Sequence, residues 1–325
     1  MNALVTGGTG FIGSHLVDTL LKQGHTVTCL VRNTTKTAWL TGKPVVFVKG
    51  TLEDKDALMR AVSGADVVFH VAGLTAARSR GDFWRGNVEG TKHLLDAATT
   101  VPGLKRFVHV SSLAAVGPAT EGHPVDERTP YHPITTYGES KRAAEDLVFS
   151  YSRRLPIAIV RPPAVYGPRD AGVYTYFQTL SKGIMPLIGF SDKMVSLVHV
   201  QDVVNGAILA ATEEGAVGEA FFISSEKFYS WREIGGVTKR VMNKRAVSVR
   251  VPHSVVWAVS SISQFLGRFQ AKPPIFDREK GQDIVQRYWT CDVKKAKEIL
   301  HYRESIDLAD GIKETVEWYR STGWL

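Results

Sequence analysis

Short apolar runs alternate with longer amphipathic segments along the first half of the chain. The short runs are rich in β-branched residues and predict six β-strands, at Asn2–Thr6, Thr26–Val31, Val45–Lys49, Val67–Val71, Arg106–Ser111 and Ile157–Arg161. In the segments between them, apolar residues recur every three to four positions. This spacing predicts helices, at Ile12–Gln23, Asp54–Val62, Asn87–Thr99 and Tyr137–Arg154. Such alternation is typical of βαβ units, so we expect an α/β fold with a doubly wound parallel sheet.

The regular alternation weakens after Pro163, where Pro and Gly become frequent. This change predicts one domain over residues 1–165 and a smaller, partly interleaved C-terminal domain built from residues 166–194 and 213–325. A strand-like run and a helical run within residues 195–212 are expected to rejoin the first domain. The end of the chain predicts two closing helices, at Val293–Leu300 and Leu308–Tyr319.

A glycine-rich segment, Thr6 to Gly13, lies between the first predicted strand and helix and reads TGGTGFIG. Glycine permits a sharp turn, close backbone approach to a pyrophosphate and tight packing of helix on strand. The helix start offers unpaired N–H groups and the positive end of its dipole to an anion. A plain glycine-rich turn is the alternative, but the flanking strand and helix favour a dinucleotide site. The residues expected to contact the dinucleotide here are Gly7, Gly10, Phe11, Ile12 and Gly13.

The end of the second predicted strand indicates which dinucleotide is bound. In NAD-binding proteins a carboxylate normally lies here and binds the 2′-hydroxyl of the adenosine ribose. In this chain Val31 is followed by Arg32, and the next acid is Glu53. Arginine makes bidentate contacts to phosphate, so Arg32 favours NADP(H) over NAD(H). Two alternatives remain: Arg32 is only a solvated loop residue, or Lys36 binds the phosphate instead or as well.

Tyr137 and Lys141 lie four residues apart at the start of a predicted helix. Residues at this spacing share a helix face, so the phenol and the ammonium can point to the same place. A neighbouring cation stabilises a phenolate and lowers the pKa of a tyrosine towards the range used for proton transfer. Such pairs also occur by chance, so the spacing alone is weak evidence.

Ser112 strengthens this interpretation. It follows the fifth predicted strand, at the carboxyl edge of the sheet where open α/β folds bind ligands. A serine hydroxyl there can hold the oxygen that Tyr137 protonates or deprotonates. The alternative for this serine is an ordinary cap at the end of a strand.

These features together resemble the extended short-chain dehydrogenases/reductases, the superfamily of NAD(P)-dependent epimerases and dehydratases. The matching segments run through most of the chain and are specific as a set: Thr6–Gly13, His70–Gly73, Asn87–Thr91, Ser111–Ser112, Tyr137–Lys141, Arg161–Pro168 and Val198–Val203. The resemblance implies a Rossmann-type fold with a C-terminal substrate-binding domain, and a homodimer. It also implies that Tyr137 is the general acid/base, that Lys141 holds the nicotinamide ribose and that Ser112 binds the reacting oxygen.

The resemblance further implies contacts along the cofactor, and no metal site is predicted. The superfamily commonly has an acidic residue after the third strand, near the adenine, whereas this chain has Thr51 and Leu52 there. A polar adenine contact is therefore in doubt, although the cofactor itself is not. The residues expected along the cofactor, besides the glycine-rich segment, Arg32, Tyr137 and Lys141, are Leu52, Val71, Ala72, Pro162, Ala164 and Val165.

One position separates two branches of the superfamily. Members that act on sugar nucleotides generally carry an Arg just before the strand that ends in His-Val, and it binds the substrate diphosphate. Here that position is Val195, whose apolar side chain cannot replace a cation, although Arg169 or Lys193 could compensate. The alternative branch resembles dihydroflavonol reductases and 3β-hydroxysteroid dehydrogenases, which act on apolar substrates. Arg32 and the apolar stretch from Val255 to Phe269 fit this branch. The stretch could cover an apolar substrate or lie on a membrane surface, and the alternative is an ordinary core helix.

The charge of the chain is concentrated in one window. The protein has 325 residues, of which 44% are hydrophobic and 22% charged, as in an ordinary globular protein. Its formal net charge of +8 lies entirely in Lys227–Lys272, which holds nine cations and one acid. No nucleic-acid motif accompanies these cations, so we expect no nucleic-acid partner. Basic residues around an apolar segment can bind anionic lipid, so peripheral membrane contact through residues 227–272 is one hypothesis, and a solvated basic face is the other.

The two cysteines, Cys29 and Cys291, form no metal or disulfide motif. The apolar run after Met1 has no basic segment before it and is interpreted as a strand rather than as a signal peptide. We therefore expect a cytoplasmic protein. The first functional hypothesis is an NADP(H)-dependent oxidoreductase that interconverts a ketone or aldehyde and an alcohol on a largely apolar small molecule. The alternative is a nucleotide-sugar epimerase or dehydratase with tightly bound NAD(P). A third hypothesis, a cofactor-sensing regulator without catalysis, leaves Ser112, Tyr137 and Lys141 without a purpose.

Overall fold

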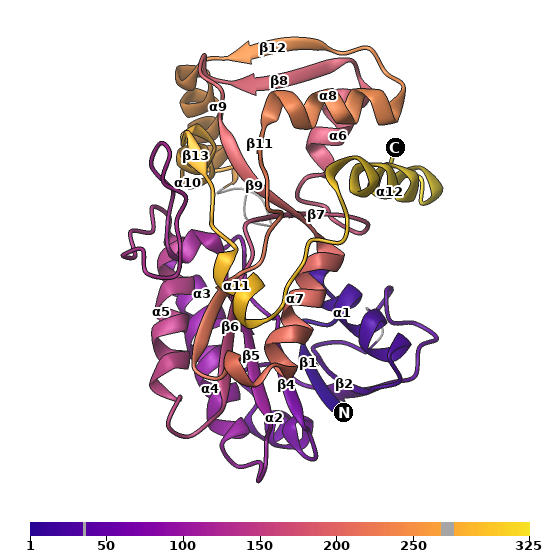
Figure 1. Ribbon diagram of the computed structural model, residues 1–325, viewed down its shortest axis with the longest axis vertical. Helices are drawn as coiled ribbons and strands as arrows, with labels where there is room; N and C mark the ends of the chain where they lie inside the picture. Colours follow the sequence, from indigo (N-terminus) through magenta and orange to yellow (C-terminus); the bar gives the residue numbers. More distant parts are fainter. Residues whose placement is uncertain (35–36, 268–275) are drawn as a thin grey trace.

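The computed structural model describes residues 1–34, 37–267 and 276–325. Its largest element is a seven-stranded, fully parallel sheet with strand order β10-β6-β5-β4-β1-β2-β3 (Figure 1). The strands are β1 (Asn2–Thr6), β2 (Thr26–Val31), β3 (Val45–Lys49), β4 (Val67–His70), β5 (Arg106–Val110), β6 (Ile157–Arg161) and β10 (Glu219–Phe222). The doubly wound α/β fold expected from the alternation is confirmed.

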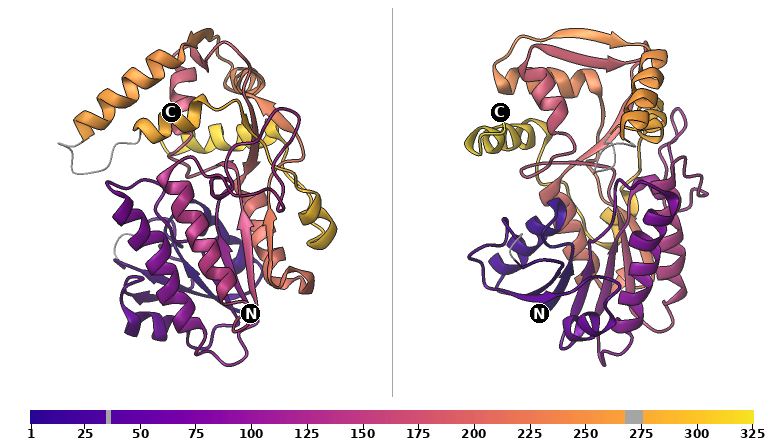
Figure 2. Two further views of the ribbon diagram at one scale, coloured as in Figure 1. Left: turned by 90° about the vertical axis from the view of Figure 1, so that its left-hand side faces the viewer. Right: turned by 180° about the vertical axis from the view of Figure 1, so that it is seen from behind.

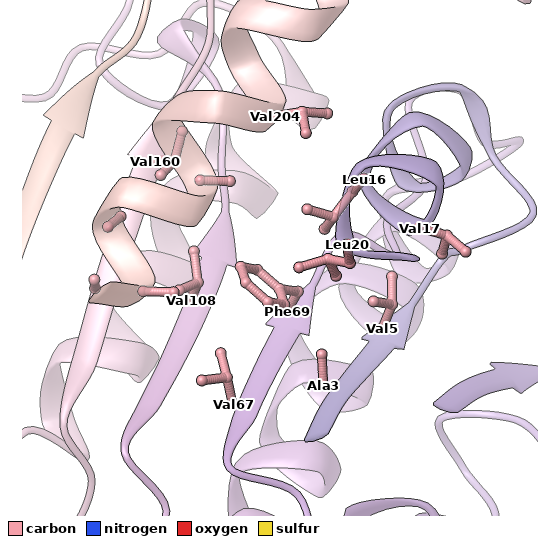
Figure 3. Close-up of a cluster of buried hydrophobic side chains, with 14 of the residues drawn as sticks. Ala3, Val5, Leu16, Val17, Leu20, Val67, Phe69, Val108, Val160 and Val204 are labelled. Carbon is pink, nitrogen blue, oxygen red and sulfur yellow. The ribbon is translucent and has the colours of Figure 1, made fainter. Parts of the chain in front are cut away.

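Helices cover both faces of this sheet because successive side chains of each strand point to opposite faces. Ala3 and Val5 of β1 pack on one face under α1 (Phe11–Lys22) and α7 (Val200–Thr212). Leu4 packs on the other face, which is covered by α2 (Lys55–Val62), α4 (Gly90–Ala98) and α5 (Thr136–Ser150). Figure 3 shows the first of these cores, where the Phe69 ring lies between side chains from neighbouring strands and from α1. Both cores lie below the carboxyl edge of the sheet and hold it rigid.

The remaining elements lie over that carboxyl edge (Figures 1 and 2). One small sheet contains β7 (Ala164–Tyr166), β9 (Met194–His199), β11 (Phe228–Ser230) and β13 (Tyr288–Trp289), and another pairs β8 (Ile184–Ile188) with β12 (Val247–Val251). The helices of this part are α6 (Tyr174–Ser181), α8 (Trp231–Met242), α9 (His253–Gly267), α10 (Arg278–Val285) and α12 (Leu308–Ser321). Helix α11 (Lys294–Ile299) instead packs against β10 and joins the core of the large sheet through Ala296. A separate core, which includes Phe177, Ile234 and Tyr319, holds α6, α8 and α12 together.

Two assignments along the chain differ from the expected division. Strand β10, within residues 213–325, is an edge strand of the seven-stranded sheet and pairs with β6. The run Ala220–Ile223 is fully apolar and buried, as is typical of a strand covered on both faces. Within residues 195–212, only α7 packs on the large sheet, because β9 pairs with β7, β11 and β13 instead.

The smaller elements near the sheet edge complete the fold. A short helix α3 (Arg80–Phe83) continues into a π-helical turn, η1 (Trp84–Glu89), before α4 begins. The helix predicted at Asn87–Thr99 therefore starts earlier, with a widened turn. A 3₁₀ turn, η2 (Leu113–Ala115), follows β5, and the two predicted closing helices correspond to α11 and α12.

Candidate active site

The glycine-rich segment adopts a turn in which only glycine fits at two positions. Gly7 has a φ of +75°, and a Cβ atom there would lie 2.6 Å from the backbone nitrogen of Ala72. A Cβ at Gly13 would lie 2.2 Å from the Gly7 carbonyl oxygen. The turn therefore brings the end of β1, the start of α1 and the segment after β4 into direct backbone contact.

The start of α1 is suited to a bound phosphate. Its N-cap, Gly10, is exposed and gives no side-chain cap to the first N–H groups of the helix, and no acid lies in the first turn. Nearby, the hydroxyl of Ser111 is buried with no hydrogen-bond partner among the described residues. The uncapped N–H groups at the start of α1 fit the diphosphate of a dinucleotide. The unpartnered Ser111 hydroxyl, at the end of β5, fits its nicotinamide end. The residues present therefore fit the cofactor that the sequence predicts.

Ser112 and Tyr137 lie side by side at the carboxyl end of β5. The Ser112 side chain accepts a hydrogen bond from the Ala114 N–H at 3.1 Å and begins η2. Helix α5 packs closely on η2, since a Cβ at Gly138 would lie 2.4 Å from the Ala114 carbonyl oxygen. This close approach places Tyr137, the preceding residue, in hydrogen-bond contact with Ser112.

Lys141 lies one helical turn after Tyr137 and is 5% exposed. Its ammonium group donates a hydrogen bond to the Val110 carbonyl oxygen at 2.8 Å, so it is fixed at the end of β5. Burial lowers the pKa of Lys141 to about 8, although the nearby Glu145 carboxylate acts in the opposite direction. Lys141 therefore still carries its charge at neutral pH.

The pKa of Tyr137 differs from the expectation. Burial raises this pKa, the hydrogen bond from Ser112 acts to lower it, and the negative charge of Asp283 raises it. The expected lowering of the Tyr137 pKa by Lys141 is wrong for this structure, because burial outweighs the other influences. Tyr137 is thus held in its protonated form at neutral pH.

A chain of hydrogen bonds links the glycine-rich segment to α5. Asn87, buried in η1, accepts a hydrogen bond from the Leu74 N–H at 2.7 Å and donates to the Ser140 hydroxyl at 2.9 Å. The Thr91 hydroxyl donates to the Asn87 carbonyl at 2.6 Å, so it can only accept from His70 Nε2, 2.8 Å away.

His70 Nδ1 then accepts from the Thr6 hydroxyl at 2.7 Å, which fixes the neutral tautomer of the ring. Burial, together with the charge of Lys141, lowers the pKa of His70 to about 3. The sequence comparison included Asn87, His70 and Thr91 in family motifs but assigned them no role. Their hydrogen bonds connect Thr6, at the start of the glycine-rich segment, with Ser140 on α5, the helix that carries Tyr137.

Helix α10 brings two acidic residues to the start of α5 from far along the chain. The Glu279 carboxylate accepts hydrogen bonds from the N–H and the hydroxyl of Thr136, 143 residues away in sequence. Asp283 lies one turn later on α10, close enough to influence the pKa of Tyr137. No sequence signal connects these acids with Tyr137, because their proximity arises only from the packing of α10.

The other predicted cofactor residues lie at the same sheet edge, with differing exposure. Val71 and Ala72 contact Gly7, and the carbonyl of Pro162 accepts a hydrogen bond from the Leu113 N–H at 2.9 Å. Ala164 and Val165 begin β7. Arg32 is exposed just after β2, and Leu52 lies half-buried against Gly90 of α4. Lys36 lies outside the described residues.

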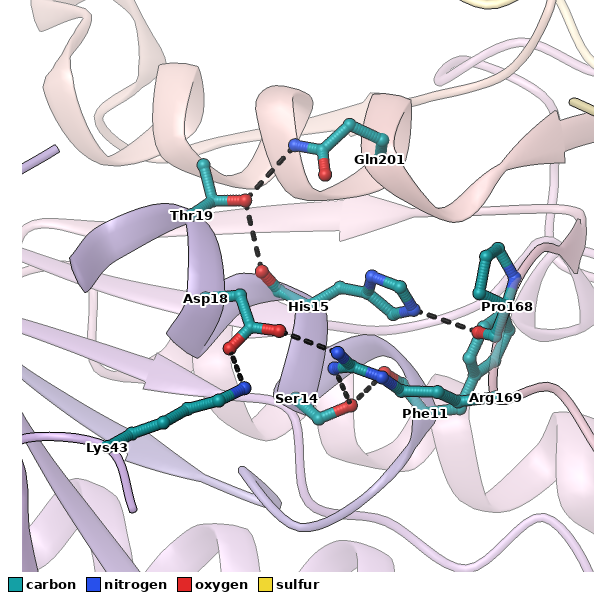
Figure 4. A network of polar contacts seen from close by, with 9 residues as sticks. All are labelled: Phe11, Ser14, His15, Asp18, Thr19, Lys43, Pro168, Arg169 and Gln201. Carbon is teal, nitrogen blue, oxygen red and sulfur yellow. Dashed lines mark hydrogen bonds and ion pairs between the residues drawn. The ribbon is translucent and has the colours of Figure 1, made fainter. Parts of the chain in front are cut away.

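The two cations that could compensate for Val195 have other partners. The Arg169 guanidinium donates to Ser14 and forms an ion pair of 2.7 Å with Asp18, both on α1 (Figure 4). The Lys193 ammonium is 5% exposed and donates to the carbonyls of Val285 and Gln286. Val195 itself is buried in β9.

One cavity of the described structure lies away from the predicted catalytic residues. It has a volume of about 320 Å³, and its lining includes His15, Asp18, Arg169 and Trp318. We assign the candidate active site from the convergence of Ser112, Tyr137 and Lys141 rather than from this cavity, because that place combines an acid/base group with the glycine-rich turn.

Comparison with known proteins agrees with this geometry. The family model described as the NAD dependent epimerase/dehydratase family matches residues 3–224. The ceramide reductase of Caulobacter vibrioides is 31% identical over 324 residues, which cover 99% of this chain and 95% of that protein. A 4-hydroxy-2-methyl-3-oxo-4-farnesyl-3,4-dihydroquinoline-1-oxide ketoreductase of Stigmatella aurantiaca is 30% identical over 323 residues, covering 96% of this chain and 95% of that protein.

The solved structures similar to this one include the UDP-glucose 4-epimerase of Thermotoga maritima with UDP-glucose. It superposes with a TM-score of 0.81 and 26% identity, over 99% of both chains. Reductases and epimerases thus share this architecture. The chain belongs to the NAD dependent epimerase/dehydratase family and is an NAD(P)-dependent enzyme of the extended short-chain dehydrogenase/reductase type.

Proposed function

We propose that the protein is an NADP(H)-dependent oxidoreductase that interconverts a ketone or aldehyde and an alcohol on a largely apolar small molecule. The main observation that supports an oxidoreductase reaction is the contact between Ser112 and Tyr137, with Lys141 one helical turn away. The cofactor, when bound, supplies or accepts a hydride. The protein then has to orient the carbonyl and move one proton.

The side chains at the site suit these tasks. Ser112 is placed to donate a hydrogen bond to the substrate oxygen, and Tyr137 to protonate the same oxygen during reduction. A raised pKa keeps the phenol protonated at neutral pH, which is the form that acts as a proton donor. The Lys141 cation, fixed by the Val110 carbonyl, is proposed to hold the nicotinamide ribose.

The substrate class is proposed from three described positions that could supply a cation for a diphosphate. A diphosphate needs a cation, and the three positions considered for one are the apolar Val195 and the already paired Arg169 and Lys193. Two of the similar proteins are by name reductases of molecules with apolar chains, a ceramide and a farnesyl-bearing quinoline. Both arguments favour an apolar ketone over a sugar nucleotide.

The preference for NADP(H) is proposed on the basis of Arg32. Its exposed guanidinium follows β2, where the 2′ position of the adenosine ribose is bound in this type of fold. Replacing Arg32 by Ala should weaken NADPH binding by roughly 10- to 100-fold, since a charge-assisted phosphate contact contributes about 1.5–3 kcal/mol, and should leave NADH binding unchanged. Titration of intrinsic fluorescence measures both affinities, with Lys313→Ala on α12 as a control. Equal loss of NADPH and NADH affinity would contradict the assignment.

A ligand panel tests the proposed activity itself. We expect NADPH and a long-chain ketone or a steroid to raise the melting temperature, because ligands that bind the native state stabilise it. We also expect that substrate to cause net oxidation of NADPH. UDP-glucose and dTDP-glucose should give no stabilisation.

The second candidate is a nucleotide-sugar epimerase or dehydratase with tightly bound NAD(P). The likeness to a UDP-glucose 4-epimerase over 99% of both chains favours it. Stabilisation by UDP-glucose, together with a cofactor that stays bound and is not consumed, would establish this function and overturn the first. A homodimer in the cytoplasm is proposed for either function, and light scattering after gel filtration measures the mass of the assembly.

A further inference from the structure

Most of the exposed large apolar side chains in the described part of the chain gather in one region. We call this region the apolar face; it comprises residues 184–190, strand β12 and helix α9. Phe190 and Val247 are 73% and 72% exposed. Single exposed apolar residues are normal, but a contiguous group indicates a surface that meets a partner. The exposed residues of the face used in this argument are Ile184, Phe190, Val247, Val249, Val255, Val259, Ile262 and Leu266.

Helix α9 supplies the longest part of the apolar face. Its 15 residues include no Asp, Glu, Lys or Arg. Val256 and Ser260 are buried and face Gly281 of α10. A different stripe is exposed: Val259 and Ile262 lie three residues apart, and Leu266 follows four residues later, at the spacing of one helix face. Val259 and Ile262 are 50% and 59% exposed. An outward helix face without charges is unusual for a helix exposed to water.

In Figure 2 (left view) α9 projects from the side of the molecule, so its outer stripe can reach a flat surface. None of the described helices is long and apolar enough to cross a bilayer. Contact with a membrane would therefore be made by a helix lying in the plane of its surface.

Cations border the apolar face. Lys182 precedes β8, and Lys244 and Arg245 precede β12; all three are exposed. The acid Glu233 is engaged in the cap of α8, where its carboxylate accepts from the N–H and hydroxyl of Ser230. The acid Asp192, two residues after Phe190, lies 3.8 Å from the cation Arg232. Cations therefore outnumber acids along this border.

We propose that the apolar face docks on the surface of an anionic lipid bilayer. Its stripe would enter the boundary between headgroups and acyl chains, and its cations would lie against anionic headgroups. A second copy of the chain is a poorer occupant, because a two-fold contact pairs the same surface with itself and would bring two positive borders together. The benefit of docking rests on the proposed function, since docking would place the enzyme where an apolar ketone is concentrated. The structural observations for docking do not depend on that function.

Vesicle co-sedimentation of the full chain, without substrate or cofactor, tests the proposal. Binding should be strong to phosphatidylcholine vesicles that contain phosphatidylglycerol and weak to phosphatidylcholine alone. Removing two border cations with Lys244→Ala and Arg245→Ala should reduce the partition coefficient roughly 25-fold, at about fivefold for each cation. The matched control, Arg303→Ala with Lys313→Ala, removes two exposed cations elsewhere and should change nothing.

The apolar stripe is tested separately. Ile262→Ser with Leu266→Ser should lower binding more than tenfold, whereas Val46→Ser, at a residue of the large sheet that is 54% exposed, should have no effect. Equal binding to neutral and anionic vesicles, loss of binding in the controls, or self-association that depends on Ile262 without vesicle binding would each overturn the proposal. Failure of ketone reduction would leave these readouts unchanged, so the two proposals fail independently.

Discussion

Lys141 shows how one buried charge connects stability with chemistry. Its ammonium group is 5% exposed and is held by the Val110 carbonyl. Burying a cation disfavours its charged form, and this accounts for the lowering of the Lys141 pKa to about 8. The protein retains this unfavourable burial at the place where a cation is needed beside Tyr137.

The cost of this burial should appear in the pH dependence of stability. The pKa of Lys141 is about 8 in the folded protein against 10.5 for an ordinary lysine, so the unfolded chain binds more protons between these values. The free energy of unfolding should therefore rise with pH from about 8 to 10.5, by at most about 3 kcal/mol. Urea unfolding of the wild type and of Lys141→Met across this range isolates the effect, because the variant lacks the group. Parallel stability profiles of the two proteins would contradict this explanation.

Asp283 and Ser112 influence the pKa of Tyr137 in opposite directions. In the proposed reaction, alcohol oxidation uses the Tyr137 phenolate as a base, so the rising limb of its pH–rate profile should report this pKa. Asp283→Asn removes a negative charge and should move the limb to lower pH. Ser112→Ala removes a hydrogen bond and should move it to higher pH, in addition to slowing the reaction.

A remote control separates these shifts from general effects of charge. Glu298→Gln on α11 removes an exposed acid and should leave the limb in place. Shifts of the two site variants in the same direction would show that the geometry around Tyr137 has been misinterpreted.

At the level of elements, the turn between β1 and α1 depends on close backbone contacts that leave no space for a Cβ atom. A Cβ at Gly13 would lie 2.2 Å from the Gly7 carbonyl oxygen, whereas a Cβ at Gly236 of α8 meets nothing within 4 Å. Gly13→Ala should reduce NADPH affinity roughly 10- to 100-fold, because overpacking costs about 1–3 kcal/mol. Gly236→Ala should retain affinity and gain about 0.5–1 kcal/mol of stability. Calorimetric titration with NADPH measures the affinities, and wild-type binding by Gly13→Ala would refute the role of this contact.

The same scale shows which elements a sequence can predict. Six strands of the large sheet were predictable because each is a compact apolar run between turns or amphipathic helices. Strand β10 is not among the predicted strands and lies within the range expected for the C-terminal domain, because its pairing with β6 is a tertiary contact across a long stretch of chain. Helix α9 could be taken for a core helix from its composition, but most of its apolar side chains are exposed.

At the scale of the whole molecule, some residues of the candidate site can be predicted from the sequence and others cannot. The glycine-rich segment, Ser112, Tyr137 and Lys141 follow recognisable spacings next to strand ends. Glu279 and Asp283 reach the start of α5 only because α10 packs there, and no local pattern encodes that contact. The C-terminal part of the chain therefore contributes to the environment of Tyr137 as well as lying over the sheet edge.

The central claim is that Tyr137 transfers the proton in an oxidoreductase reaction. Its most direct test is the turnover of Tyr137→Phe with NADPH and the ketone selected by the ligand panel, measured together with NADPH affinity. Turnover should fall roughly 10²- to 10⁴-fold, the usual contribution of a general acid, while NADPH affinity stays the same, because Phe preserves the ring and removes only the hydroxyl. Normal turnover by Tyr137→Phe would contradict the proposed mechanism.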